Sequence, residues 1–332
     1  MTDFWRNKKV IVTGANGFLG SHLTLELLRK KAVVTGIIKE KVPASYLHRH
    51  CVSGSCPGRL QLITCDIADT RKVLRVFGRV KPQVCLHVAA QPLVGLANKS
   101  PLGTFESNIT GSWNILEAVR RTGVESTVVA SSDKAYGEHK ILPYRETSAL
   151  RALHPYDASK ACTDILTQVY AHTWGVKTAV TRCANIYGPG DMNFSRIIPD
   201  TMRAVIRSVP PVIRSDGTPV RDYVYIADVV DAYLLLAQRL FSGKVSSGEA
   251  FNFGNGKPID VLSLVRKILR IAGRSDLIPV IKSSGKISGE IDRQYLSSVK
   301  ARRVLGWRPR YSLDKGLRLT LKWYGHYCAA GR

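Results

Sequence analysis

Three glycines between an apolar stretch and an amphipathic one constrain the fold of this chain more than any other feature. The segment VIVTGANGFLGSH carries Gly14, Gly17 and Gly20 just before a leucine-rich stretch at 21–31. Side chains are excluded where a chain turns tightly from a strand into a helix and approaches a pyrophosphate, whose charge the helix N–H groups stabilise. The spacing GxxGxxG departs by one residue from the GxGxxG dinucleotide fingerprint, but its strand–turn–helix context is the required one. The sequence therefore predicts a dinucleotide site at 14–20.

Apolar runs and amphipathic segments alternate along the chain after this loop. The patterns predict strands and helices in turn, with strands at 8–14, 32–38, 60–67, 84–90, 126–132 and 178–188, and helices at 21–31, 68–80, 107–121 and 157–175. Such alternation implies right-handed crossovers and a parallel sheet with helices on both faces. The predicted fold class is therefore α/β, a Rossmann-type doubly wound parallel sheet.

The regular alternation loosens after residue 188, which indicates a second domain. The chain has 332 residues, enough for one large domain or two closely joined ones. The segment DYVYIADVVDAYLLLAQRL indicates a strand and a helix that returns to the main sheet. We therefore expect a cofactor-binding Rossmann domain of residues 1–185 plus about 224–258. A smaller substrate-binding domain, of residues 186–223 and 259–332, is expected to close over the substrate.

The composition sets limits on partners and compartment. The formal net charge is +24, which favours anionic partners, but the cations are spread along the chain and no zinc-finger spacing or RNA-binding aromatic motif is present. We therefore expect a basic surface around an anion site rather than nucleic-acid binding. No apolar run is long enough to span a membrane, and the N-terminal segment does not resemble a signal peptide. Seven irregularly spaced cysteines predict no metal site and favour a reducing, cytoplasmic setting.

A tyrosine and a lysine at helical spacing form the candidate catalytic pair. Tyr156 and Lys160 lie one turn apart at the start of the helix expected at 157–175, and Ser132 precedes them at the end of a predicted strand. A nearby ammonium favours the ionised phenol, so we expect a Tyr156 tuned toward neutral pH. Such a phenol removes a proton from a sugar or alcohol hydroxyl while hydride leaves the carbon. Ser132 is expected to hydrogen-bond the same hydroxyl.

The end of the second predicted strand bears on the choice between NAD and NADP. An acidic residue there binds the adenosine ribose diol, whereas a basic one favours a 2′-phosphate. This chain has both, Lys39 followed by Glu40. We expect NAD because of Glu40, and Lys39 leaves NADP open. Asp66, at the end of the third predicted strand, suits a contact to adenine, with a turn or capping role as the alternative.

Several motifs together resemble the extended short-chain dehydrogenase/reductase family along nearly the whole chain. They are the glycine loop, HVAAQ (87–91), Asn108, SSDKAYG (131–137), YDASK (156–160), RCANIYGPGD (182–191), RDYVYIADV (221–229) and LGWRP (305–309). Within that family the chain is most similar to nucleotide-sugar 4,6-dehydratases, those acting on CDP-glucose above all. That similarity rests on AAQPLV at 89–94 and on the triplet Ser132-Asp133-Lys134. A 4-epimerase of the same family is the alternative, and it would more often have a small or hydroxyl residue at position 133.

The resemblance implies an internal redox cycle on a bound cofactor. Tyr156 would deprotonate the sugar 4-hydroxyl while hydride moves from C4 to NAD, water would leave from C6 and C5, and the hydride would return to C6. Asp133 would protonate the departing 6-hydroxyl. Lys134 stands where relatives acting on dTDP-glucose have a glutamate as C5 base, and it either serves as that base or orients Asp133.

The resemblance also implies binding residues and a homodimer. Substrate diphosphate and sugar contacts are expected from Asn185, Arg196, Arg221 and Arg293. The nucleobase is not distinguished. Apolar side chains on the helices at 107–121 and 157–174 would pair two chains in a four-helix bundle. Expected cofactor contacts come from Gly14, Asn16, Gly17, Phe18, Leu19, Gly20, Lys39, Asp66, Ile67, Ala89, Ala90, Gln91, Asn108, Tyr156 and Lys160.

Overall fold

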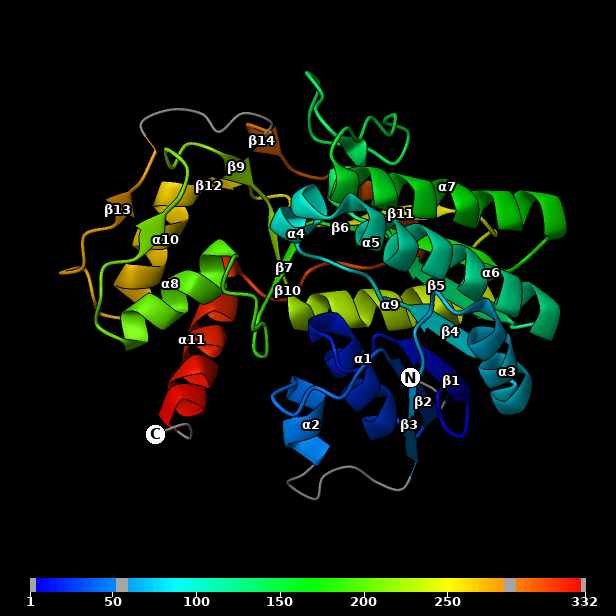
Figure 1. Cartoon of the computed structure of the whole chain (residues 1–332). Helices are drawn as coiled ribbons and strands as arrows, with labels where there is room; N and C mark the ends of the chain where they lie inside the picture. The colour runs from blue at the N-terminus through cyan, green and yellow to red at the C-terminus, as the bar shows by residue number, and fades with distance from the viewer. Residues whose placement is uncertain (1–3, 52–58, 284–290, 330–332) are drawn as a thin grey trace.

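A seven-stranded parallel sheet lies at the centre of the computed structural model, which describes residues 4–51, 59–283 and 291–329 (Figure 1). The strand order is β11-β6-β5-β4-β1-β2-β3. The inner strands β4 and β6 are buried along their full length, because helices cover both faces. The strand bounds are β1 (Lys9–Thr13), β2 (Val33–Ile38), β3 (Leu60–Thr64), β4 (Val84–His87), β5 (Ser126–Ala130), β6 (Thr178–Cys183) and β11 (Ala250–Phe253).

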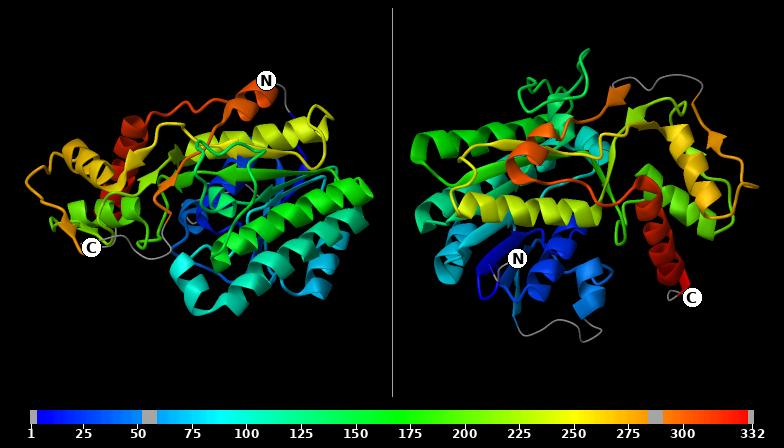
Figure 2. Two further views of the ribbon diagram at one scale, coloured as in Figure 1. Left: turned by 90° about the horizontal axis from the view of Figure 1, so that it is seen from above. Right: turned by 180° about the vertical axis from the view of Figure 1, so that it is seen from behind.

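Helices on the two faces of this sheet make a three-layered structure (Figure 2). Helices α3, α6 and α7 pack side by side on one face, and α1 and α9 pack together on the other. Leucines at helical spacing explain the packing of α1, where Leu23 and Leu27 are fully buried. The helix bounds are α1 (Phe18–Arg29), α3 (Thr70–Val80), α6 (Gly111–Thr122), α7 (Pro155–Trp174) and α9 (Ile226–Phe241). The predicted Rossmann-type doubly wound fold class is confirmed.

The strand predicted at 178–188 is wrong in its second half, because the chain changes sheets there. The amide of Ala184 still donates to β11, but the next amide, of Asn185, donates to a carbonyl beside another strand. As a result β7 (Asn185–Tyr187) pairs with β10 (Tyr223–Tyr225) in a separate two-stranded sheet. Helix α9 returns to the main sheet as predicted, whereas the strand before it does not.

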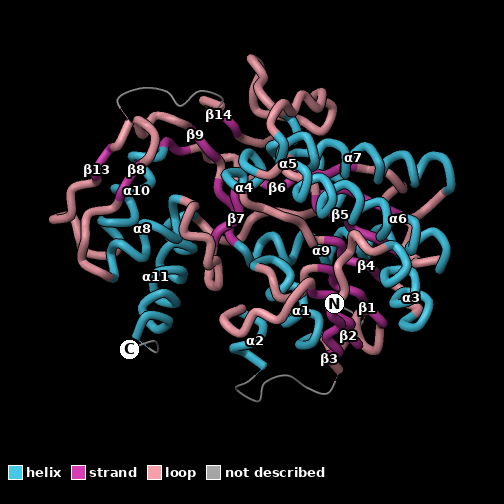
Figure 3. The backbone as a smooth tube through the Cα atoms, in the orientation of Figure 1, coloured by secondary structure: helices cyan, strands magenta, loops and turns pink. Residues whose placement is uncertain are grey.

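A second group of elements packs around its own hydrophobic core beside the sheet (Figure 3). Met202, Leu264 and Leu317 are fully buried in that core, and each comes from a different helix. The short strands β9, β12 and β14 form a three-stranded sheet next to it, and β8 pairs with β13. The bounds are α8 (Ile197–Ile206), α10 (Val261–Ile271), α11 (Leu313–Ala329), β8 (Val212–Ile213), β9 (Val220–Arg221), β12 (Ile259–Asp260), β13 (Val280–Ile281) and β14 (Arg293–Gln294).

The helix predicted at 107–121 belongs to a longer helical stretch that widens in the middle. It runs through α5 (Pro101–Phe105) and a π-helical turn, η2 (Glu106–Thr110), into α6, and α4 (Val94–Lys99) precedes it. Asn108 lies in the π-helical turn and is buried. Turns of this kind occur frequently at functional sites, since they redirect one residue out of the regular helical array.

A short helix, α2 (Tyr46–His50), lies between β2 and β3, and residues 52–58 lie outside the described part. Cys51, at the end of α2, is disulfide-bonded. The cysteines at 65, 85, 162, 183 and 328 are free. Among the described residues, no helix is long and apolar enough to cross a membrane.

Candidate active site

A cavity of about 1020 Å³ opens at the carboxyl ends of the central strands, beside the second group of elements. Parallel α/β sheets bind their ligands at this edge. Among the described residues, Asn108, Lys160 and Arg293 do not line it. The predicted site residues that line it are Gly14, Asn16, Gly17, Phe18, Leu19, Gly20, Lys39, Asp66, Ile67, Ala89, Ala90, Gln91, Ser132, Asp133, Lys134, Tyr156, Asn185, Arg196 and Arg221.

The glycine loop leaves room for an anion at the start of α1. Gly14 has a positive φ of +65°, and a Cβ there would lie 2.9 Å from the backbone of Ala89. A Cβ on Gly20 would lie 2.0 Å from the carbonyl oxygen of Gly14, so any side chain would force the turn open. Gly17 directly precedes the helix, whose first turn carries no acidic residue. The loop therefore fits a dinucleotide pyrophosphate, which the free N–H groups of the helix would bind.

The two residues that bear on the adenosine end pair with each other. Lys39 Nζ lies 2.9 Å from Asp66 Oδ2, so the cation already has an anionic partner. Glu40 follows on the rim of the cavity, and its carbonyl accepts a 2.7 Å hydrogen bond from Asn16 Nδ2. A 2′-phosphate would compete with Asp66 for Lys39, and the carboxylates of Asp66 and Glu40 would repel it. A ribose diol is uncharged and would not be repelled.

The expected catalytic pair lies in the first turns of α7. Lys160 is buried, and its Nζ donates to the carbonyl of Ala130 at 2.8 Å. Burial lowers the pKa of Lys160 to about 8. Tyr156 reaches the cavity, and its hydroxyl forms a hydrogen bond with Ser132. Ser132 and Tyr156 are thus together, with Lys160 beneath them against the end of β5.

The expectation that Tyr156 is tuned toward neutral pH is wrong for the protein alone. Burial raises the pKa of Tyr156 to about 12, and the neighbouring carboxyl of Asp133 raises it further. The guanidinium of Arg196 and the hydroxyl of Ser132 act in the opposite direction without reversing the shift. The physical reason is that burial disfavours the ionised phenolate more than the nearby guanidinium and hydroxyl favour it.

Asp133 has a buried carboxyl, one oxygen of which has no hydrogen-bond partner among the described residues. Its side chain is in the lining of the cavity although the residue is only 2% exposed. Oδ1 accepts a hydrogen bond from Ser132 Oγ at 3.2 Å, and Oδ2 has no partner among the described residues. Burial raises the pKa of Asp133, and the charges of Lys134 and Arg221 offset this only partly. Asp133 is therefore inclined to hold a proton, which an acid catalyst requires.

Lys134 is held by a residue that the sequence did not single out. Its Nζ donates to Gln294 Oε1 at 3.0 Å, and Gln294 Nε2 donates to the carbonyl of Asp133 at 3.2 Å. The sequence pointed instead to Arg293, which is exposed and whose guanidinium lies over the ring of Tyr295. Which of two neighbouring strand residues faces inward depends on strand pairing, so no local signal favoured Gln294.

The remaining substrate candidates surround the opening of the cavity. Arg221 is largely buried and donates to the carbonyls of Val220 and Asp292. Arg196 is more open, and its Nη1 lies 3.1 Å from the buried carboxylate of Asp191. Asn185, at the start of β7, lines the same region. Arg196 and Arg221 thus bring positive charge into the cavity near Tyr156 and Asp133.

The family of this chain is evident once these features are compared with known proteins. The NAD dependent epimerase/dehydratase family matches residues 10–254, and that range includes the glycine loop, Ser132, Tyr156 and Lys160. This chain belongs to the NAD dependent epimerase/dehydratase family. The resemblance to extended short-chain dehydrogenases is confirmed, and so is NAD as the cofactor.

Similar members of this family catalyse two different reactions. The CDP-glucose 4,6-dehydratase of Salmonella typhimurium is 29% identical over 97% of this chain and 92% of its own. The UDP-glucose 4-epimerase of Streptococcus mutans is 30% identical over 96% of this chain and 97% of its own. A solved structure of the dTDP-glucose 4,6-dehydratase of Streptomyces venezuelae, with NAD bound, is 26% identical, has a TM-score of 0.86 and covers 97% of this chain and 98% of that one. The chain is therefore a sugar-nucleotide enzyme, and similarity alone does not decide between dehydratase and epimerase.

Asn108 braces the cofactor side of the cavity of this family member from behind. Its Oδ1 accepts from the amide of Gln91 at 2.7 Å, and its Nδ2 donates to Ser159 Oγ at 2.9 Å. Ser159 Oγ in turn donates to the carbonyl of Tyr156 at 2.7 Å. Asn108 thus connects the loop after β4 with the helix turn that carries Tyr156.

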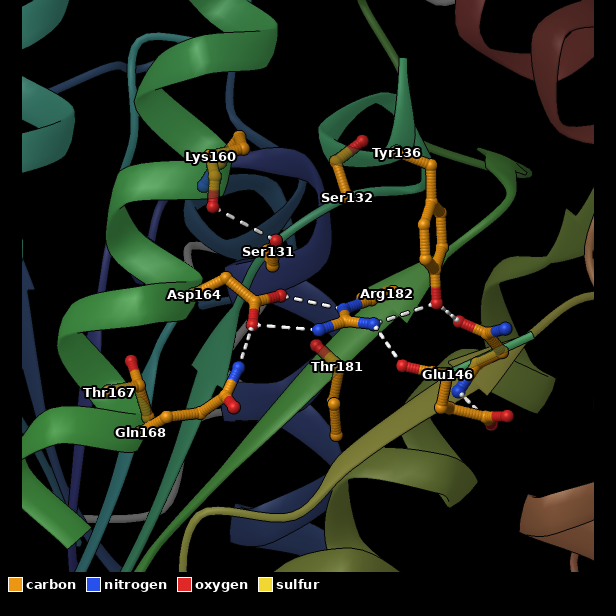
Figure 4. A network of polar contacts seen from close by, with 12 residues as sticks. Ser131, Ser132, Tyr136, Glu146, Lys160, Asp164, Thr167, Gln168, Thr181 and Arg182 are labelled. Carbon is orange, nitrogen blue, oxygen red and sulfur yellow. Dashed lines mark hydrogen bonds and ion pairs between the residues drawn. The ribbon is translucent and has the colours of Figure 1, made fainter. Parts of the chain in front are cut away.

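A buried ion pair anchors α7 to the sheet (Figure 4). Arg182, on β6, bonds to both carboxylate oxygens of Asp164, at 2.7 and 2.9 Å. Its third bond, of 2.9 Å, goes to the hydroxyl of Tyr136, which lies two residues after Lys134. Asp164 is one helical turn beyond Lys160, so this one guanidinium fixes α7 and the turn Asp133–Tyr136 relative to each other.

Proposed function

We propose that this enzyme is a nucleotide-sugar 4,6-dehydratase that converts an NDP-hexose, of the CDP-glucose or GDP-mannose type, to the NDP-4-keto-6-deoxyhexose. The observation that carries the proposal is Asp133, a residue of the cavity lining whose carboxyl is buried, has a raised pKa and keeps one oxygen without a partner among the described residues. A dehydration at C6 needs an acid, because hydroxide is a poor leaving group and water is a good one. A 4-epimerisation breaks no C–O bond and needs no such acid.

The proposed chemistry divides among three side chains. NAD, when bound, supplies the reversible oxidation and reduction of the sugar, and its positive nicotinamide ring favours the ionised form of Tyr156. Tyr156 accepts the proton of the sugar 4-hydroxyl, and Ser132 orients that hydroxyl. The 4-keto group makes the C5 proton acidic, and loss of this proton expels the 6-hydroxyl. Asp133 donates the proton that turns the departing hydroxide into water.

Two roles are proposed for Lys134, and both suit its place beside Asp133. As the C5 base its amine would accept the proton from carbon directly. As an orienting group it would hold the Asp133 carboxyl toward C6, and a second group would take the C5 proton. Lys134→Ala should stop water loss in the first case and only slow it in the second.

Asp133→Asn should stop water loss while leaving oxidation at C4 possible. The amide has the shape of the carboxyl but cannot give up a proton, so the sugar is stranded after oxidation and reduced cofactor accumulates. The experiment incubates both proteins with CDP-glucose, GDP-mannose, UDP-glucose and dTDP-glucose. Products are weighed by mass spectrometry, and nicotinamide absorbance reports the reduced cofactor.

The accumulation of reduced cofactor serves as the internal control, because it requires a folded variant with both ligands bound. Loss of one water by the wild type is the expected result. If every NDP-hexose yields only products of unchanged mass, the enzyme is a 4-epimerase instead. If Asp133→Asn dehydrates normally, another group donates the proton and the role of Asp133 is refuted. The similarity to UDP-glucose 4-epimerases makes a 4-epimerase the second candidate.

We further propose that the domains divide the work as the sequence suggests. Residues 1–185 with about 224–258 would bind NAD, and residues 186–223 with 259–332 would bind the sugar nucleotide. The substrate contacts proposed for Asn185, Arg196 and Arg221 come from the border of the two regions. A cytoplasmic location remains part of the proposal.

A homodimer is the proposed assembly, through the outer faces of α6 and α7. Trp113, Ile165 and Val169 are 44%, 52% and 41% exposed, although each is apolar. Ile115 and Leu116 of α6 are fully buried within the chain, so they are not available to such an interface. Light scattering at micromolar concentration should therefore give twice the chain mass of 36.6 kDa.

Ile165→Glu should give one chain mass, because two carboxylates would be buried at the interface. A monomeric wild type would refute the dimer.

A further inference from the structure

Gln294 connects the second group of elements to the loop that carries Asp133 and Lys134, called the catalytic loop below. The residue is fully buried, and its amide bridges two successive residues of the loop. Its Oε1 accepts from Lys134 Nζ at 3.0 Å, and its Nε2 donates to the carbonyl of Asp133 at 3.2 Å. The orientation of the amide is dictated by its partners, since an ammonium only donates and a carbonyl only accepts.

The strand that carries Gln294 is fixed on both sides. In β14, Gln294 pairs with Arg221 of β9, and the amide of Val220 donates to the carbonyl of Asp292 at 2.7 Å. Beyond β14, the amide of Tyr144 donates to the carbonyl of Tyr295 at 3.0 Å. A side chain on a backbone held in this way has little freedom, so it can determine where a flexible lysine lies.

Strand geometry explains why Gln294 faces the site and its neighbour does not. Successive residues of a strand point to opposite faces. Arg293 is exposed, whereas Gln294 and its strand partner Arg221 are both buried. The same face of this small sheet therefore carries a candidate phosphate ligand and the group that holds Lys134.

We propose that Gln294 is a positioning residue for the elimination step, which acts through Lys134 and the backbone of Asp133. This inference rests on the proposed dehydratase function. A neutral amide gives Lys134 Nζ one fixed acceptor, so its remaining bonding directions are aimed at the substrate and at Asp133. Without Gln294, the four-carbon lysine stem would sample other rotamers, and the carbonyl of Asp133 would lose its donor.

The test compares Gln294→Met with wild type, using the NDP-hexose of the panel above that wild type converts. Methionine has a similar length but can neither accept from Lys134 nor donate to Asp133. The expected result is a kcat lowered by about 10- to 100-fold with KM nearly unchanged, the scale of a misplaced catalytic group. Deuterium uptake at C5 from heavy water should fall in parallel, while oxidation at C4 continues.

A double-mutant cycle separates positioning from a merely structural role. In a Lys134→Ala background, Gln294→Met should lose most of its effect on kcat, because its target is already gone. Gln294→Asn, whose amide is set back by about 1.5 Å, should also lower kcat, and it leaves a polar group in place if the methionine variant does not fold. The matched control is Gln61→Met, at an exposed position of β3 outside the cavity, which should leave kcat unchanged.

The outcomes distinguish this inference from the proposed function. If wild type loses water and Gln294→Met turns over like wild type, the role of Gln294 is refuted and the dehydratase stands. Equal effects of Gln294→Met with and without Lys134 would refute it as well. If wild type yields only isomers, the dehydratase and the elimination role of Gln294 fail together.

Discussion

Replacement of Arg182 by methionine should lower the free energy of unfolding by about 3–5 kcal/mol, because a buried carboxylate would lose its cation. The side chains of Arg182 and Asp164 are only 4% and 0% exposed. In the variant, the Asp164 carboxylate would keep the hydrogen bond from Gln168 Nε2 but would have lost both bonds from the guanidinium. Urea unfolding followed by circular dichroism measures the difference.

An exposed ion pair provides the matched control. Lys267 Nζ lies 2.8 Å from Asp314 Oδ1, with the side chains 29% and 53% exposed, so Lys267→Met should change stability far less. If Arg182→Met and Lys267→Met lowered the free energy of unfolding equally, burial of the ion pair would not explain the loss. The double variant Asp164→Leu/Arg182→Met should recover part of the loss, since it leaves no unpaired charge. Full recovery is not expected, because Arg182 also bonds Tyr136.

Tyr156→Phe should lower kcat by about 10²-fold or more, the scale of losing a positioned acid–base group. The ring remains, and only the hydroxyl that reaches the cavity beside Ser132 is removed. Folding and NAD binding should therefore be unchanged. Steady-state turnover measures kcat, and calorimetric titration with NAD measures cofactor binding.

The control for this variant is Tyr311→Phe, which removes the same hydroxyl from a ring outside the cavity lining. Its turnover should match wild type. A Tyr156→Phe enzyme that turns over at nearly the wild-type rate would show that another group accepts the proton. A variant that no longer binds NAD would show instead that Tyr156 holds the cofactor.

The sequence alone determined the sheet edge at which the site lies. Gly14, Gly17 and Gly20 are recognisable because their spacing between an apolar stretch and a leucine-rich helix marks a tight strand-to-helix turn, which is a local signal. The alternation of apolar runs with helical patterns indicated the parallel sheet, since strands that helices cover on both faces are apolar throughout. Ser132, Asp133 and Tyr156 follow predicted strands or open a predicted helix, so their convergence on the cavity was foreseeable.

Only the tertiary structure decided what each of these groups is bonded to. Lys160 Nζ donates to the Ala130 carbonyl, and burial raises the pKa of Tyr156 against the opposing charge of Arg196. The chain changes sheets between Ala184 and Asn185, where no glycine or proline marks the change. The charged Arg293 was expected to bind substrate, yet the neutral Gln294 reaches the site.

The difference has one physical origin. Turn glycines, apolar periodicity and helical spacing are properties of a few consecutive residues, so they are visible in the sequence. Burial, hydrogen-bond partners and the face of a short strand depend on segments distant along the chain. Gln294 meets Lys134 across 160 positions of sequence, and the Arg182–Asp164 pair is buried only because β6 and α7 pack together. The sequence by itself thus determined the fold and the place of the site, and the packing of distant segments decided its electrostatics.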